Sequence, residues 1–272
     1  METEKIITPY ERVQIARKTN RPNVMDYIAA LFDDFVELKG DRLLADDESI
    51  VGGIALFRGS PVTVIGHRKG RTTEENLRYN FGMASPEGYR KALRLMKQAE
   101  KFERPVITFV DTPGAYPGIE AENHGQSIAI AECIAKTITL KVPVISIITG
   151  EGSSGGALAI CAADSVWMLE NAVYSILSPE GFAAIVWKDA KKAEQACELM
   201  KLTARELLEY GLIDGVIPED RQSLHMLRKM LTKEINRLSR MSAESLTAAR
   251  YKKYRYIEGA YAPMAGSEAG VK

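Results

Sequence analysis

Residues 142–157 read VPVISIITGEGSSGGA, in which an apolar, β-branched run gives way to a glycine-rich segment. The pattern predicts a buried strand at Val142–Ile148, a loop at residues 149–154 and a short apolar helix at Gly155–Ala163. The first N–H groups of a helix have no partner within the helix, and the helix dipole adds positive potential there. We therefore expect an anion-binding end where this helix begins.

Strand-like and helix-like segments alternate on both sides of this stretch. Toward the C-terminus these are strand-like Ser165–Leu169 and Val173–Leu177, then a helix opened by Ser178, Pro179 and Glu180. Toward the N-terminus they are a helix at His124–Thr137, a strand at Pro105–Val110, a helix from Ser85 or Pro86 to about Phe102, and a hairpin of Ile50–Phe57 and Pro61–Gly66. Alternation of this kind predicts an α/β fold with parallel strands and helical crossovers.

The two ends of the chain are richer in charge. Val24–Leu38 is amphipathic and follows Asn23, a suitable N-cap, so it predicts a helix. The tail from about Ser223 is basic and has a helical pattern. We expect a single domain over residues 1–272, with an N-terminal helical extension at about 1–40 and a C-terminal helical extension at about 223–272.

Composition excludes several classes of function. The chain has 36 basic and 36 acidic residues, so its overall charge predicts neither a nucleic-acid nor a membrane partner. Its three cysteines form no CxxC pair, and we expect no metal and no disulfide but reduced thiols in a cytoplasmic protein. The N-terminus has no apolar signal region, and Val142–Ile148 is too short to span a bilayer.

Two glycine-containing loops are the candidates for chemistry. Asp111–Gly118 follows a predicted strand and holds two Pro-Gly pairs, and Gly150–Ala157 lies between a strand and a helix. Loops at the carboxyl ends of parallel strands converge on one crevice. Backbone donors gathered there would form an oxyanion hole, a set of N–H groups aimed at developing negative charge. The alternative is that both are tight turns that only pack closely.

The second loop also allows two sharper hypotheses. As a phosphate-binding P-loop it fails, because Gly156 stands where the motif needs lysine. As a nucleophile elbow it fits, since Ser154 is the serine of a G-x-S-x-G motif. A serine nucleophile needs a base, however, and the one downstream histidine, His225, lies in a charged and apparently solvated helix. We therefore favour the oxyanion hole without a nucleophile.

Five segments carry a resemblance to a known family. They are RYNFGMASPEGYRKA (78–92), VDTPGAYPG (110–118), GEGSSGGALAI (150–160), YSILSPEG (174–181) and RYKKYR (250–255). Together they closely resemble the α subunit of the acetyl-CoA carboxylase carboxyltransferase, over nearly the whole chain. The resemblance implies a crotonase-like fold of stacked β-β-α units in two nearly perpendicular sheets wrapped by helices. Clp-type serine peptidases share that fold and carry a histidine on a strand that matches Tyr174–Leu177, where this chain has none.

The resemblance also implies a reaction and its partners. With a β subunit that bears a zinc ribbon, in an α2β2 assembly, such a chain moves a carboxyl group to acetyl-CoA and so makes malonyl-CoA for fatty acid biosynthesis. The carboxyl group arrives as carboxybiotin on the biotin carboxyl carrier protein, and biotin carboxylase completes the complex. No cofactor is expected to be bound covalently. The alternatives are a stand-alone crotonase-fold acyl-CoA enzyme and a non-catalytic docking subunit.

By motif position, the resemblance assigns site residues. The backbone amides of Gly156 and Ala157, with Gly155 as neighbour, are the expected oxyanion donors. The expected carboxybiotin pocket consists of Pro113, Gly114, Ala115, Tyr116 and Gly152.

Outside this pocket, the basic run His67–Arg71 after the hairpin is ambiguous. Within it, Arg68, Lys69 and Arg71 are candidate contacts for CoA or for the partner, and the alternative is a solvated loop. His124 is expected at a capping or surface position, not as a general base.

Overall fold

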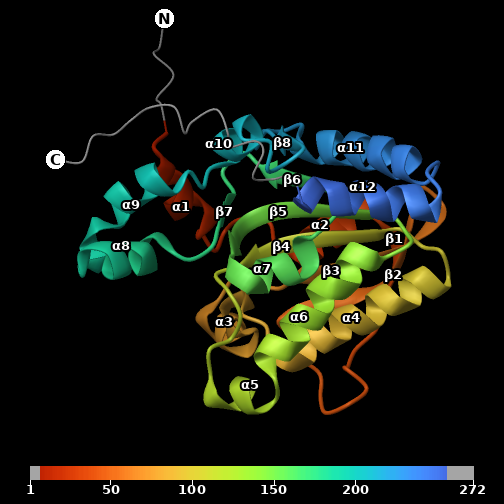
Figure 1. The fold of residues 1–272 in the computed structure, drawn as a ribbon, viewed down its shortest axis with the longest axis horizontal. Coiled ribbons are helices and arrows are strands. Elements are labelled where there is room, and N and C mark those ends of the chain that lie inside the picture. Colours follow the sequence, from red (N-terminus) through yellow and green to blue (C-terminus); the bar gives the residue numbers. More distant parts are fainter. Residues whose placement is uncertain (1–6, 256–272) are drawn as a thin grey trace, which may run out of the picture.

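The computed structural model describes residues 7–255 and is organised around one mixed sheet (Figure 1). Its strands are β1 (Asp33–Glu37), β2 (Ile50–Phe57), β3 (Ser60–His67), β4 (Val106–Thr112), β5 (Val144–Ser153), β6 (Ser165–Leu169), β7 (Val173–Ser175) and β8 (Gly215–Ile217). The order is β1-β2-β3-β4-β5-β6-β8, with β7 paired to β5 off this path. The first three strands are antiparallel, and β3 to β8 pair in parallel.

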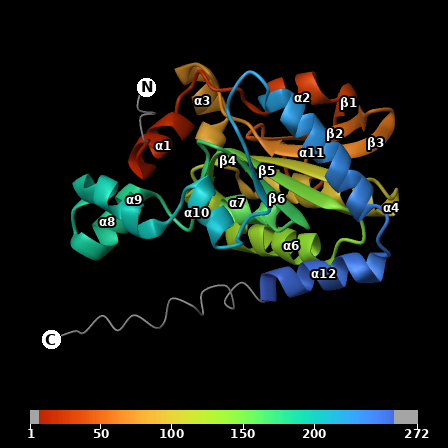
Figure 2. The same cartoon turned by 90° about the horizontal axis from the view of Figure 1, so that it is seen from above.

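Helices cover both faces of the sheet (Figures 1 and 2). They are α1 (Pro9–Ala16), α2 (Val24–Leu31), α3 (Thr73–Arg78), α4 (Pro86–Lys101), α5 (Ile119–Asn123), α6 (Gln126–Thr139), α7 (Ser154–Cys161), α8 (Pro179–Trp187), α9 (Ala193–Met200), α10 (Ala204–Glu209), α11 (Ser223–Leu238) and α12 (Ala243–Arg255). One layer holds α4, α6 and α7, with α12 against α6, and the opposite layer holds α2 and α11. None of the described helices is long and apolar enough to cross a membrane.

The apolar pattern of the central strands explains this layering. Every residue of β5 is buried, as expected for a parallel strand covered on both faces. The main core is continuous from α2 through the sheet to α4 and α6. A second, smaller apolar cluster holds α1 and α9 to β7, and its members are Val13, Ala16, Val173, Cys197 and Leu202. With this cluster, α8 and α9 form a lobe beside the sheet (Figure 2).

Several sequence predictions need correction. The helix predicted for Val24–Leu38 ends at Leu31, and residues 33–37 form β1, which pairs with β2. The N-terminal extension is therefore not only helical. The loop predicted at 149–154 is strand as far as Ser153, because β5 continues and pairs with β7. Hydrogen bonding joins the described strands in one sheet, with β7 as a branch, where the resemblance implied two.

Other predictions are confirmed. The hairpin falls on β2 and β3, and the helix from Pro86 is α4, which begins with that proline. The basic tail forms α11 and α12 as far as residue 255. The remaining parts of both extensions, residues 1–6 and 256–272, lie outside the described residues. All three cysteines are free and buried.

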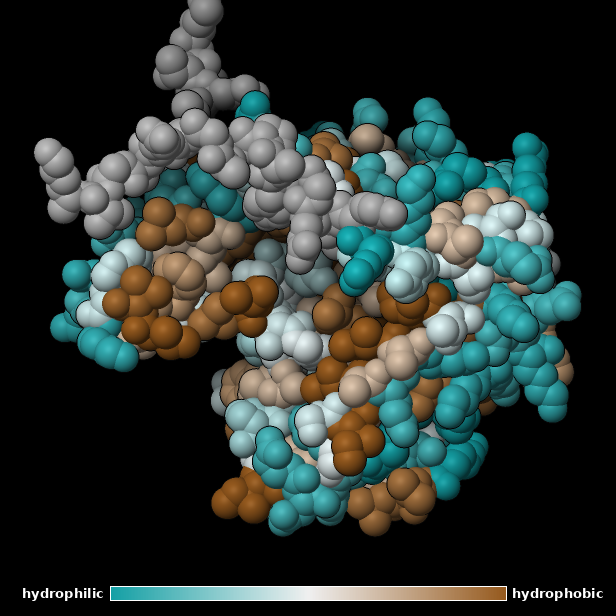
Figure 3. Space-filling model, viewed as in Figure 1, coloured by the Kyte–Doolittle hydropathy of each residue, from teal (hydrophilic) through white to brown (hydrophobic). Residues whose placement is uncertain are grey.

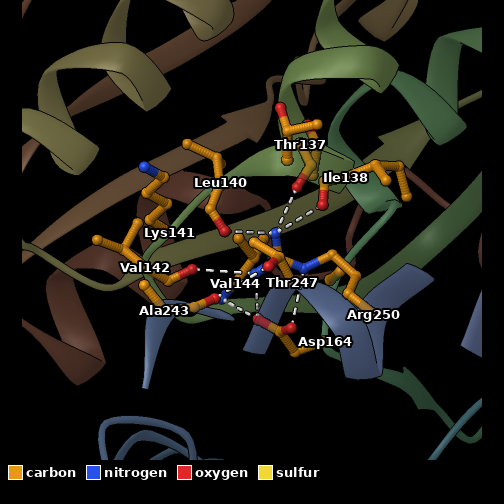
Figure 4. A network of polar contacts seen from close by, with 12 residues as sticks. Thr137, Ile138, Leu140, Lys141, Val142, Val144, Asp164, Ala243, Thr247 and Arg250 are labelled. Carbon is orange, nitrogen blue, oxygen red and sulfur yellow. Dashed lines mark hydrogen bonds and ion pairs between the residues drawn. The ribbon is translucent and has the colours of Figure 1, made fainter. Parts of the chain in front are cut away.

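A buried arginine ties α12 to the end of α6 and the start of β5 (Figure 4). The guanidinium of Arg250 donates to the backbone carbonyls of Thr137, Leu140 and Val142 at 2.7 to 3.0 Å. It also forms two bonds with Asp164, at 2.8 and 2.7 Å. The side chain of Arg250 is fully buried and that of Asp164 is 4% exposed. Arg250 thus satisfies carbonyl groups that the end of α6 leaves without helical partners.

Candidate active site

The two predicted loops meet at Gly156, on the carboxyl side of β4 and β5. A Cβ atom built on Gly156 would lie 2.6 Å from the backbone N of Ala115, 2.7 Å from the backbone C of Gly114 and 2.8 Å from the Tyr89 hydroxyl oxygen. Side chains essentially never approach backbone this closely. Glycine at this position therefore lets the start of α7 pack directly against the 114–115 segment, and the sequence prediction that these loops converge is confirmed.

Local hydrogen bonds fix the first loop. Thr112 Oγ1 donates to the carbonyl of Gly114 at 2.7 Å and accepts from its N–H at 3.1 Å. Gly114 has φ of 144°, a conformation that favours glycine. The amide of Gln126 donates to the carbonyls of Ala84 and Tyr116 and so ties the loop to α6. The wall formed by residues 113–116 is therefore held in place by its own backbone and by a neighbouring helix.

The second loop turns sharply from β5 into α7. Ser154, the first residue of α7, is exposed and has φ of 58°, which is strained for a residue with a side chain. The N-cap residue, Ser153, makes no side-chain capping bond. The amides of the first helical turn, which include Gly155, Gly156 and Ala157, are therefore left without a side-chain acceptor. This is the arrangement that an oxyanion hole requires.

Within the described residues, no histidine is paired with Ser154. His225 is exposed on α11, as the sequence predicted. His124 lies at the C-cap of α5, 43% exposed, and its Nδ1 is 3.0 Å from Glu87 Oε1, which agrees with the predicted capping or surface role. The strand β7 carries no histidine. The geometry thus does not provide the base that a serine nucleophile needs.

An apolar cleft opens beside the start of α7. It has a volume of about 700 Å³ and lies between the sheet and the α8–α9 lobe. Its lining includes Ser154 and Gly155, Tyr174 of β7, Phe182 of α8 and Leu199 of α9. Figure 3 shows the hollow between the lobe and the body, with hydrophobic side chains gathered on the lobe. The start of α7, through Ser154 and Gly155, therefore stands at the edge of an apolar cavity, the usual setting of a small-molecule site.

A buried ion network lies on the other side of the same strand ends. Lys69 Nζ is 2.7 Å from Asp111 Oδ1 and 2.9 Å from Glu151 Oε2. Arg17, the C-cap of α1, binds Glu151 at 2.8 Å and also Glu180, at the start of α8, at 2.7 Å. Burial alone would lower the pKa of Lys69, but the two carboxylates outweigh it and raise that pKa. The network links the strand that leads into α7 to the α8–α9 lobe.

The network predicts a loss of stability in acid. Burial alone would raise the pKa of Glu151, but Lys69 and Arg17 outweigh it and lower that pKa below its ordinary 4.5. A group with a lowered folded-state pKa stabilises the fold above its unfolded-state pKa, and this contribution is lost as pH falls through the folded-state value. We expect Glu151→Gln to be less stable than the wild type at pH 7, with the difference shrinking below pH ~4.5.

Urea unfolding at a series of pH values measures this difference. Glu209→Gln is the matched control, because Glu209 is exposed and pairs only with Arg205 on the surface of α10. A Glu151→Gln deficit that stays constant from pH 7 to pH 3 would contradict the assignment.

The structure separates the members of the basic run. Arg68 stacks its guanidinium 4.3 Å from the centre of the Tyr79 ring, and Arg71 pairs with Asp26 on the surface. Lys69 and Arg71 line a polar pocket of about 360 Å³ together with Arg17 and other residues of the segment after α1. The ammonium of Lys69 already faces two carboxylates, so the ion network explains this residue. Arg68 and Arg71 remain candidates for contacts with CoA or with the partner.

The sequence grouped His67 with the basic run that it opens and gave it no role of its own. The solvated loop considered for this run is wrong for His67, which ends β3 and is 1% exposed. The available signal was that His67 directly follows the apolar run Pro61–Gly66, with no turn residue after Gly66. The remaining predicted residue, Gly152, is buried beneath the Tyr174 ring.

Comparison with known proteins gives a consistent result. Residues 2–258 match the family model described as "Acetyl co-enzyme A carboxylase carboxyltransferase-like". The chain is 54% identical, over 92% of its length and 80% of the relative, to the acetyl-coenzyme A carboxylase carboxyl transferase subunit alpha of Carboxydothermus hydrogenoformans. It is 55% identical to the subunit of the same name from Clostridium acetobutylicum, over 94% and 97% of the two chains.

Solved structures confirm the fold. Transcarboxylase 12S, with methylmalonyl-coenzyme A bound, superposes with a TM-score of 0.69 at 18% identity, over 88% of this chain and 46% of that one. A chain of a Pseudomonas malonate decarboxylase hetero-tetramer in complex with coenzyme A superposes with a TM-score of 0.65 at 15% identity, over 82% of this chain and 91% of that one. The crotonase-like architecture that the sequence motifs implied is the one observed.

Proposed function

The chain belongs to the family of acetyl-CoA carboxylase carboxyltransferase α subunits, and we propose on that basis that it works with a β subunit to carboxylate acetyl-CoA. The product is malonyl-CoA, for fatty acid biosynthesis. Carboxybiotin, delivered on a biotin carboxyl carrier protein, supplies the carboxyl group. The observation that carries the proposal beyond family membership is the uncapped start of α7 at the edge of an apolar cleft.

In this proposal the chain stabilises charge and holds the reactant in place. The amides of Gly156 and Ala157, with Gly155 adjacent, donate to the oxygen on which negative charge develops. Pro113, Gly114, Ala115 and Tyr116 form one wall, and Gly152 lets Tyr174 lie against the strand. The apolar cleft excludes water and strengthens the donors, since hydrogen bonds to charge are stronger at low dielectric.

The partners follow from the same reasoning. Acetyl-CoA activation needs a second set of donors, and we assign it to a zinc-ribbon-bearing β subunit in an α2β2 assembly, with biotin carboxylase in the full complex. Exposed apolar side chains on the lobe support a docking surface: Ile176 is 79% exposed, Ile185 65% and Val186 51%. Arg68 and Arg71 are proposed contacts for CoA phosphates or the partner. The three reduced thiols support a cytoplasmic location.

A reconstitution experiment tests the function. The purified chain is assayed for malonyl-CoA formation alone and with a β-type subunit, using carboxylated carrier protein and acetyl-CoA. We expect activity only in the mixture, and co-elution of the two chains in size-exclusion chromatography. An active single chain would favour a stand-alone acyl-CoA enzyme. Full activity after the α7 amides are altered would favour a docking subunit.

Ser154→Ala is expected to keep turnover within about tenfold of the wild type. No described histidine activates Ser154, and alanine retains the N–H groups of the turn. The turnover number of the reconstituted complex measures this, with circular dichroism as the folding control. A loss beyond about a thousandfold in a folded, partner-bound variant would instead indicate nucleophilic catalysis.

A further inference from the structure

Two buried polar side chains lie behind the proposed oxyanion hole without a hydrogen-bond partner among the described residues. They are His67, through both ring nitrogens, and Tyr89, through its hydroxyl. Their exposed fractions are 1% and 0%. A buried polar group without a partner destabilises the fold, and an apolar side chain of similar size would not. A compensating role in the site would explain why these side chains are polar.

Both groups lie on the side of the sheet that carries α7. The Tyr89 hydroxyl oxygen lies 2.8 Å from the position that a Cβ on Gly156 would take, so it faces the backbone of that residue. His67 ends β3, next to β4, and the segment that follows β4 packs against Gly156. The preceding residue of β3, Gly66, faces Val24 of α2. Successive residues of a strand point to opposite faces, so His67 faces the layer that holds α4, with Tyr89, and α7.

The backbone of Gly156 also acts on the His67 ring. Burial, with a smaller contribution from the Lys69 ammonium, lowers the pKa of His67 to about 3, although the Gly156 backbone acts in the opposite direction. Only an acceptor stabilises a protonated ring, so the group involved is the Gly156 carbonyl. The contact does not meet hydrogen-bond geometry in the structure. Hydrogen bonds at catalytic sites are often long in the free protein and tighten when charge develops.

We propose that His67 is a positioning residue for the oxyanion hole: its neutral ring donates to the Gly156 carbonyl and thereby orients and polarises the peptide whose N–H belongs to Ala157. The Tyr89 hydroxyl lies against the backbone of Gly156 in the same turn. This inference rests on the proposed function, because it assumes that the Ala157 amide receives developing charge. Neither side chain touches the reactant.

The physical argument is cooperativity within one peptide group. A donor to the carbonyl draws electron density from the nitrogen, and the N–H becomes a stronger donor to an anion. If the His67 ring became protonated near pH 6, its donation to the Gly156 carbonyl would change with pH in the range where the enzyme works. Burial and the charge of Lys69 hold His67 neutral well below that range, so the donor is present throughout.

The test compares variants in the reconstituted complex. His67→Leu removes the donor and keeps an apolar side chain of similar bulk, whereas His67→Gln keeps an N–H donor. Tyr89→Phe deletes only the hydroxyl. Tyr27→Phe is the matched control, because Tyr27 is buried and stacks on Phe109 in the main core, on the α2 side of the sheet. Turnover number, KM for acetyl-CoA, thermal midpoint and the pH profile are measured for each.

We expect His67→Leu to lose about tenfold or more in turnover, less than the roughly hundred- to thousandfold loss on deleting an oxyanion donor. KM should stay within about twofold, and the thermal midpoint should hold or rise, because an unpaired polar group has been removed. His67→Gln should recover most of the turnover, Tyr89→Phe should lose part of it, and Tyr27→Phe should lose none.

Three outcomes would overturn the inference. Unchanged turnover in a folded His67→Leu complex would mean that the ring has no part in the site. A fall in the thermal midpoint that matches the fall in turnover, without rescue by glutamine, would indicate a packing role. Loss of one limb of the pH profile would make His67 a proton-transfer group. Failure of the proposed function itself is distinct, since the wild-type mixture would then form no malonyl-CoA.

Discussion

Gly156→Ala is expected to lower the turnover number of the assembled carboxyltransferase about a hundredfold or more, the loss seen when an oxyanion donor is displaced. The added Cβ would meet the backbone of Gly114 and Ala115 at 2.6 to 2.7 Å, and backbone cannot rotate away as a side chain can. Alanine is a better helix former than glycine by about 1 kcal/mol, so helix propensity alone would predict a gain. The expected loss of turnover would therefore come from displacement of the first turn of α7 away from residues 114–115.

Gly155→Ala is the matched control for this variant. A Cβ on Gly155 would meet only Ile130, at 3.4 Å, which is ordinary contact. We expect Gly155→Ala to retain most of the turnover and to bind the partner normally. Turnover at saturating carrier protein is measured for both, with circular dichroism and partner binding to confirm the fold. Equal turnover in the two variants would show that the close approach at Gly156 has no role in catalysis.

An ester in place of the Gly156 amide tests the contribution of the N–H group alone, without a change in the shape of the loop. Proline would also remove the N–H, but its ring carbons would enter the space beside Ala115, so it is not a clean deletion here. The ester removes the N–H and keeps the outline of the backbone. If Gly156 is a donor, turnover falls and carrier affinity is retained. If turnover is unchanged in a folded, partner-bound ester, the donor is the amide of Ala157 or Gly155.

Arg250→Met is expected to lower the free energy of unfolding by about 3–5 kcal/mol, the range for breaking one partner out of a buried ion pair. The change leaves the Asp164 carboxylate buried without its cation and removes the donors to the carbonyls of Thr137, Leu140 and Val142. Arg250→Lys should recover little, because a single ammonium cannot reproduce the fork of the guanidinium.

Urea unfolding of the isolated chain measures this effect. Lys252→Met, on the same helix but exposed, is the control and should change stability by less than about 0.5 kcal/mol. A deficit below about 1 kcal/mol for Arg250→Met would mean that α12 contributes little to the stability of the sheet.

The site could be predicted from sequence where local pattern decides the structure. The apolar run of β5, the start of α7 and the Ser178 cap of α8 each depend on a few residues of sequence, and all three were located, although β5 continues to Ser153, beyond its predicted end at Ile148. The strand β1 was not predictable in this way. Residues 33–37 continue an amphipathic pattern, and they become a strand because β2 offers an unpaired edge, which is a contact about twenty residues away along the chain.

The buried charges show the same limit. His67 and Lys69 stand among basic residues that read as a solvated run, and only the carboxylates of Asp111 and Glu151, which come from two other strands, explain why Lys69 is drawn inward. Arg250 likewise lies in a charged segment, yet it is fully buried against carbonyls more than a hundred residues earlier. Long-range partners of this kind leave no trace in composition or spacing.

The separate apolar cluster beneath the α8–α9 lobe has a consequence for local unfolding. Its five side chains are separate from the main core, so α9 can move away from α1 and β7 without breaking the apolar contacts of that core. Amide protons of α8 and α9 should then exchange with solvent through sub-global openings of lower free energy than those of β4 and β5. One wall of the cleft would thus belong to the least protected part of the molecule, while the amides at the start of α7 are anchored to the most protected.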